Sequence, residues 1–419
     1  MNKSLVKWLT VSFLNLLLVA FLGVVMRYKI EFALPFINQK HVLHSHSQFA
    51  FSGWITQTLM VLLVNNLSIK TGEGIFTKYR WLLYANLITA YGMLVSFIVQ
   101  GYAFYSICFS TVSIVVSFFF AAYYWKDLNR MHVQNVSHSW FKAALTFNVI
   151  SSIGTFGLAY MMLNKTMDQD WYLAMVYYFL HFQYNGWFFF AGMGLLVSNL
   201  EKINSAVRDL KIAFLLFCFA CVPAYFLSVL WIPFGSVIYG FVIAAVIAQL
   251  LGWSFMVKVF IKNKITIGQQ FSHYGKVLLL LSAIAFTIKL LLQSGSIHPE
   301  LSQLSYGFRP IIIGYLHLVL LAVTSIFIIG YIVSLNLIPV TKMFVAGTSI
   351  FVVGVITNEL LLMAQGVAGL TYSIVPHINI MLLFAAIVLF CGIAMMFISC
   401  SGSVSNRLSA VTPDKPDAP

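Results

Sequence analysis

Apolar segments of about 20 residues follow one another along almost the whole chain, and short polar links separate them. A helix of this length spans the hydrocarbon core of a bilayer. Of the 419 residues, 61% are hydrophobic and 8% are charged, and a soluble domain of this size cannot stay dispersed with so few charges. Lipid leaves an open strand edge without hydrogen-bond partners, so the spans must be helices. The sequence therefore predicts an all-α integral membrane protein.

The pattern predicts twelve transmembrane helices in one membrane domain, which covers residues 1–403. The helices are expected near residues 8–26, 45–65, 81–100, 104–125, 141–163, 172–199, 211–232, 236–260, 276–294, 310–334, 342–363 and 376–400. The polar, proline-rich residues 404–419 are predicted to form a short disordered cytoplasmic tail. No glycine-rich phosphate loop interrupts the pattern, which argues against an ATP-driven pump.

Lysine and arginine are shared unequally between the two sides of the predicted bundle. With the N-terminus inside, most of the 24 Lys and Arg residues fall on the inner links, as the positive-inside rule requires. We therefore expect a multi-pass protein of a bacterial inner (plasma) membrane with both termini in the cytoplasm. This orientation and contact with anionic lipid explain the net charge of +13, so the bilayer, and no nucleic acid, is the expected partner.

Three histidines, His46, His181 and His317, lie at nearly the same predicted depth in three different spans. At about 1.5 Å of rise per residue, each stands roughly 26–28 Å above the inner end of its span. Glu359, in another span, lies at a similar height. Ionisable side chains inside a membrane are costly, so this layer predicts a functional site. Neutral imidazole in an apolar pocket is a good ligand for haem iron or copper.

Two neighbouring details leave alternatives open. His44 lies two residues before His46 and faces the opposite side of the helix, since two residues turn it by about 200°. Either histidine could therefore be the functional one. Cys218 and Cys221 have the spacing of a metal-binding pair, but their position in an apolar span favours simple packing.

At these histidines the chain resembles the large subunit (subunit I) of the haem-copper oxidases and nitric oxide reductases. That family is a bundle of twelve helices with both termini inside. The runs that carry the resemblance are His-Ser-Gln-Phe-Ala-Phe-Ser-Gly-Trp from His46, His-Phe-Gln-Tyr-Asn-Gly-Trp from His181, and Tyr-Leu-His ending at His317. The resemblance implies that His46 (or His44) and His317 hold a low-spin haem b, and that His181 is a metal ligand.

The resemblance also implies a role in a respiratory chain, with a cytochrome c or a quinol as electron donor and small oxidase-type subunits as partners. The chain departs from the family at several ligand positions. Tyr315 replaces the first histidine of the family's His-x-His pair, and Ser228 stands where further metal ligands are usual. A copper ion or a second haem is therefore not expected to find a full ligand set. The family's propionate-binding arginines are missing, and Arg309 and Lys289 are the nearest basic substitutes.

Tyr184 and Glu359 are the candidate catalytic residues of this layer. Tyr184 and Asn185 share the helix face of His181, so a hydrogen-bonded cluster without metal is the alternative at that histidine. Three function classes remain open at this point. They are a haem b electron-transfer protein, a terminal reductase of oxygen or nitric oxide, and a polytopic transporter or metal-handling protein without a catalytic centre.

Overall fold

A computed structural model describes residues 3–409 of the chain, except residues 73, 132, 134, 165–167 and 299–308. Every regular element in the described residues is a helix. The α-helices are α1 (Lys3–Glu31), α2 (Gln39–Phe49), α3 (Gln57–Thr71), α4 (Gly74–Gln100), α5 (Phe104–Asn129), α6 (Val136–Asn164), α7 (Gln169–His181), α8 (Phe189–Leu200), α9 (Val207–Cys221), α10 (Ser236–Lys262), α11 (Lys264–Gln270), α12 (His273–Gly295), α14 (Arg309–His317), α15 (Ile326–Ser334), α16 (Lys342–Leu370) and α17 (Ile378–Ser409).

The remaining elements are two 3-10 helices, η3 (Asn204–Ala206) and η4 (Pro223–Val229), and three π-helices. The π-helices are η1 (Ala50–Thr56), η2 (Phe182–Phe188) and η5 (Leu318–Ser325). Each π-helix joins two α-helices into one continuous rod: α2 to α3, α7 to α8, and α14 to α15.

The predicted helical membrane bundle is present, but the count of twelve spans is not confirmed. In the described residues, ten helices are long and apolar enough to cross a membrane, and the count rises to eleven if the pair Asn204–Cys221 and Pro223–Val229, bent by 45°, is one span. The rod Gln169–Leu200 is continuous helix but is not among them. Its middle carries the polar run Gln183–Asn185, which makes it less apolar than the others.

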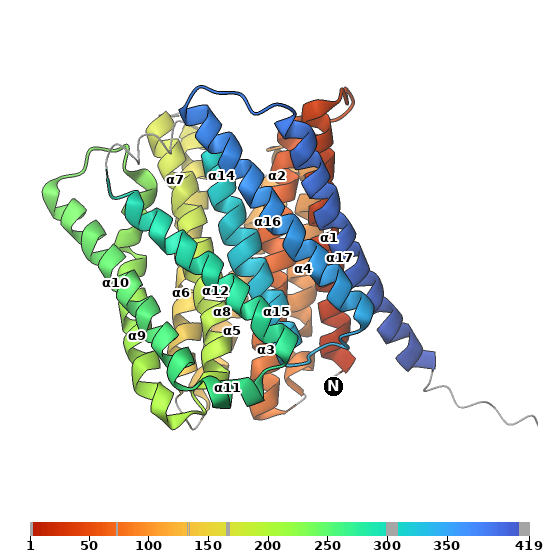
Figure 1. Cartoon of the computed structure of the whole chain (residues 1–419), viewed down its shortest axis with the longest axis vertical. Helices are drawn as coiled ribbons and strands as arrows, with labels where there is room; N and C mark the ends of the chain where they lie inside the picture. Colours follow the sequence, from red (N-terminus) through yellow and green to blue (C-terminus); the bar gives the residue numbers. More distant parts are fainter. Residues whose placement is uncertain are drawn as a thin grey trace, which may run out of the picture.

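The bundle has one end where the three histidine-bearing helices lie together. Figure 1 shows α2, α7 and α14 at the upper end, and α3, α8 and α15 at the opposite end with the N-terminus. We call the upper end the histidine end. The first and last described helices, α1 and α17, pack along each other on one side of the bundle.

Sequence signals at the helix ends explain where several of these helices begin. Asn38, Asp168, Ser272 and Thr341 each precede a helix, and each side chain accepts a hydrogen bond from a backbone N–H of its first turn. These caps satisfy donors that the helix itself cannot pair. The tight link between α4 and α5 depends on Gly101, whose φ of 65° suits glycine.

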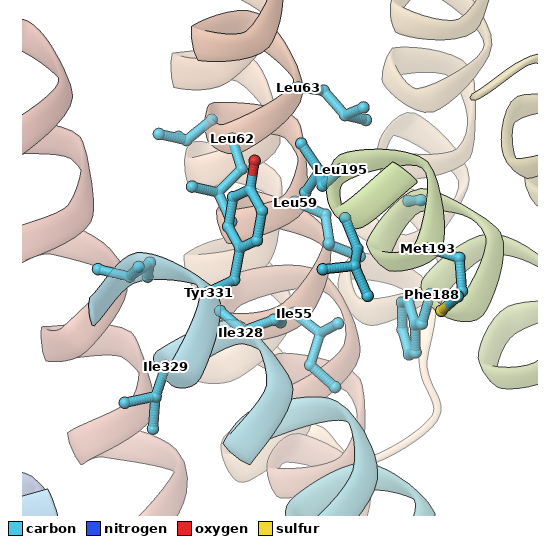
Figure 2. Close-up of a cluster of buried hydrophobic side chains, with 14 of the residues drawn as sticks. Ile55, Leu59, Leu62, Leu63, Phe188, Met193, Leu195, Ile328, Ile329 and Tyr331 are labelled. Carbon is cyan, nitrogen blue, oxygen red and sulfur yellow. The ribbon is translucent and has the colours of Figure 1, made fainter. Parts of the chain in front are cut away.

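The rod Gln39–Thr71 lies at the centre of the bundle. Of its most apolar stretch, 78% is buried inside the protein, against 22–44% for the other nine candidate spans. Figure 2 shows the apolar core that packs around it, where Leu59 and Leu63 meet Leu195 and Ile328 from the other two π-containing rods. This core holds the three rods in fixed register below the histidines.

The end of α17 differs from the predicted boundary at residue 403. The helix continues to Ser409, so residues 404–409 are helical rather than part of a disordered tail. The rest of the predicted tail, residues 410–419, lies outside the described residues.

Candidate haem and electron-transfer site

His46 and His317 are neighbours at the histidine end, near enough for their charges to interact. His46 Nδ1 donates to the Val19 carbonyl of α1 at 3.0 Å, and His317 Nδ1 donates to the Ile313 carbonyl at 2.8 Å. A carbonyl can only accept, so both rings carry their proton on Nδ1 when neutral. Both Nε2 atoms then keep a free lone pair, the form in which histidine binds a metal.

The residues that carry these two rings are only partly covered by the rest of the protein. Within the described part of the chain, neither Nε2 atom has a hydrogen-bond partner. Every residue from Pro310 to His317 is only partly buried, although α14 packs against α16 inside the bundle. His46 is also only partly buried.

Arg27 is the cation that the structure brings to these histidines. It lies in the last part of α1 and is close enough to interact electrostatically with both His46 and His317. Arg309, the residue predicted from the sequence, is the exposed first residue of α14. No local sequence pattern links Arg27 to the histidines, because it stands at the end of the first apolar segment.

His44 points away from this pair. Its ring packs edge-on against Tyr102, with ring centroids 4.6 Å apart, and Tyr102 lies in the link between α4 and α5. Gln48 donates to the Tyr102 hydroxyl at 3.4 Å. Burial raises the pKa of Tyr102, which the hydrogen bond from Gln48 partly offsets. Of the two candidate histidines on α2, His46 is the one beside His317.

His181 is fully buried and uses both ring nitrogens within the protein. Nε2 donates to the Cys221 carbonyl at 2.8 Å, and the Asn185 amide lies 3.1 Å from Nδ1. The Cys221 carbonyl is available because the helix breaks here: Tyr225 N–H, its usual helical donor, binds the Val222 carbonyl in η4 instead. His181 thus has the hydrogen-bonded arrangement with Asn185 that the sequence left open as the alternative to a metal ligand.

Tyr184 links this cluster to α14. Its hydroxyl is hydrogen-bonded to Ser228, and its ring lies against Tyr315 with centroids 6.4 Å apart. It also contacts the His181 ring. Tyr315 and Ser228 thus both contact Tyr184.

Glu359 lies on α16 and accepts a hydrogen bond from the Asn358 amide at 3.3 Å. Packing of α14 against α16 fixes its height, because Gly366 faces Ile311 and Gly314 faces Leu362. Continuing this antiparallel register places Glu359 level with His317. Glu359 therefore lies level with His317 along the bundle, and among the described residues its carboxylate has no hydrogen bond to Tyr184.

The three π-helices form a belt directly below the histidines. η1 begins one turn after His46, whereas η2 and η5 begin directly after His181 and His317. Trp54 of η1 donates to Ser325 of η5 at 2.9 Å, and Trp187 of η2 donates to Thr56 of η1 at 3.1 Å. We call these three helices the π-belt. π-Helices are rare and are often found at functional sites.

Metal coordination by side chains alone finds little support in the described residues, which contain no cluster of three or more His, Cys, Asp or Glu side chains able to hold an ion. The pair His46 and His317 is smaller than such a cluster. No known protein-family model matches the chain, and no curated protein matches it either.

Proposed function

We propose that this chain is a membrane-embedded haem b protein that transfers electrons, and that His46 and His317 would hold its low-spin haem. The observation that carries the proposal is that both imidazole rings have the same tautomer and the same kind of hydrogen bond. Each donates Nδ1–H to a backbone carbonyl and leaves Nε2 free, and the two rings lie within electrostatic range. Bis-histidine ligation of a haem needs this tautomer on both residues.

The residues around the pair suit this role. The Val19 and Ile313 carbonyls hold the two imidazoles in orientation, which is the usual task of second partners of metal-binding histidines. Arg27 supplies a partly buried positive charge that can meet a carboxylate of the haem edge. Bound there, a haem would supply a one-electron redox couple.

The proposal covers one haem and no second metal. His181 would have to give up a hydrogen bond to Cys221 or Asn185 before it could bind an ion. Dioxygen reduction to water needs a second metal close to an open haem face, so we propose electron transfer rather than terminal oxidase chemistry. The cation asymmetry of the links supports placing the histidine end on the outer side of a bacterial plasma membrane, where a cytochrome c or a quinol could be the donor.

A spectrum of the purified protein, produced with ample haem supply, tests this proposal. We expect a b-type reduced-minus-oxidised difference spectrum and about one haem per chain. A carbon monoxide difference spectrum distinguishes the ligand state, because two histidine ligands leave no open position on the iron. Protein that is folded but free of haem would remove the proposal, and strong carbon monoxide binding would remove its ligand assignment.

A further inference from the structure

A second polar site lies away from the haem pair, where the rod Gln169–Leu200 meets α9, α10 and α12. It is a cavity of about 10 Å³, room for one water-sized species. Its lining includes Lys289, Gln249, Asn185 and Cys221, with aromatic walls that include Phe286. We propose that this cavity binds one small monovalent anion, held by Lys289 and Gln249, and that the side chains lining it shift slightly outward to admit an ion as large as chloride.

The lysine is the first reason. Lys289 is 3% exposed, lies in the middle of a predicted span, and forms no hydrogen bond or salt bridge with the described residues. A buried cation without a partner is costly in a membrane protein. Such a residue must either be a neutral amine or have a counter-ion that is not part of the protein.

One contact and one missing hydrogen bond favour the charged form of Lys289. Its Nζ lies over the Phe286 ring, 5.4 Å from the centroid, an arrangement that stabilises a cation. A neutral amine could accept a hydrogen bond from the Gln249 or Asn185 amide, both of which line the same cavity. In the described residues neither amide makes that bond, and Asn185 is turned toward His181 instead.

The neighbouring groups cannot neutralise this charge. The Cys221 thiol donates to the Asn185 carbonyl, with Sγ 3.8 Å from the oxygen, so it is a thiol rather than a thiolate. His181 is a neutral acceptor at Nδ1 and a donor at Nε2. No described carboxylate contacts Lys289. The counter-ion must therefore come from solution.

Gln249 is the second, independent reason. It is 5% exposed and lines the cavity, yet its side-chain amide has no hydrogen bond among the described residues. Buried amides are normally paired. An anion beside Lys289 would accept from this amide as well, which satisfies both side chains with one ligand.

The test uses the full-length protein and chloride, with gluconate as the replacement anion at constant ionic strength. Chloride should raise the thermal unfolding temperature of the wild type by a few degrees in a saturable way, because a ligand that binds only the folded state stabilises it. Lys289→Met should abolish this response, and Gln249→Leu should weaken it several-fold. Lys258→Met is the matched control, since Lys258 also lies 5.4 Å from a phenylalanine ring but is paired with Asp209; it should keep the response.

Anomalous diffraction from crystals grown with bromide gives a second readout that does not depend on stability. A bromide peak beside Lys289 Nζ is expected in the wild type and not in Lys289→Met. The proposal fails if the wild type melts at the same temperature with and without chloride, if Lys289→Met responds as the wild type does, or if the cavity holds only a water in bromide crystals.

Discussion

The Trp54 indole N–H donates to the Ser325 hydroxyl at 2.9 Å and so joins the π-helix that follows His46 to the π-helix that follows His317. Both residues are buried. Because His46 and His317 are carried on the same two rods, this bond fixes the relative height of the rods directly below these two histidines. The Trp187–Thr56 bond does the same between the His181 rod and the central one.

Removal of the Ser325 hydroxyl should destabilise the protein more than a surface change of the same kind. Ser325→Ala leaves a buried indole N–H unpaired, which costs about 1–3 kcal/mol. In a Trp54→Phe background the same substitution should cost clearly less, because no donor remains. Thr287→Ala is the control: Thr287 accepts from Trp253 in an equivalent but exposed bond. The free energies of unfolding of the two single variants and the double variant, measured with denaturant or heat in detergent, complete a double-mutant cycle. If the two losses of stability simply add, the Trp54–Ser325 bond does not hold the two rods together.

Arg27, rather than Arg309, should tune the proposed haem. A nearby cation favours the reduced form, so Arg27→Met should lower the midpoint potential, on the order of 60 mV for a tenfold change in the one-electron equilibrium. Arg309→Met should leave it almost unchanged, since Arg309 is exposed and its charge is screened by solvent. Potentiometric titration of both variants decides between them. A shift confined to Arg309→Met would reverse the assignment.

His181 should not be a ligand of the haem or of a tightly bound copper ion. His181→Ala is expected to keep the haem spectrum, and metal analysis of the wild type should find copper well below one per chain. Quinol- or cytochrome-driven oxygen uptake should be slow in both proteins. Fast, cyanide-sensitive uptake with stoichiometric copper would contradict this view of the His181 cluster.

Close packing of α12 against α15 should make Gly275 sensitive to substitution. A Cβ atom at this position would collide with the Ser334 backbone, so Gly275→Ala should cost about 1–3 kcal/mol. Gly240→Ala in α10 meets open space and should be neutral or stabilising by up to about 1 kcal/mol, since alanine is the better helix former. Equal unfolding temperatures for the two variants would mean that the α12–α15 contact is looser than described.

Much of the bundle could be predicted because the signals are local. Ten of the predicted spans fall on described helices that are long and apolar enough to cross a membrane, as their apolar length dictates. The choice of His46 over His44 could not be made from the sequence, since it depends on the neighbouring elements. The His46 ring donates to the Val19 carbonyl of α1, whereas the His44 ring packs against Tyr102. Rotation of the helix separates the two histidines, but it does not say which side faces α14.

The π-belt and the role of Arg27 could not be predicted for a different reason. A π-helix needs one more residue per hydrogen-bonded turn than an α-helix, and the sequence of η5 carries no glycine or proline that would mark it. The bond between His181 and Cys221 depends on the broken helix at Pro223, and only the three-dimensional arrangement shows which side chain takes up the freed carbonyl. Long-range pairing of this kind leaves no periodic signal.

The reduced-minus-oxidised spectrum of three alanine variants, purified beside the wild type, tests the central claim most directly. His46→Ala and His317→Ala should each lose the b-type low-spin spectrum, because each removes one of the two free Nε2 ligands. His44→Ala should retain it with about one haem per chain, since His44 packs against Tyr102. A low-spin spectrum that survives both His46→Ala and His317→Ala, or that disappears only in His44→Ala, would contradict the account.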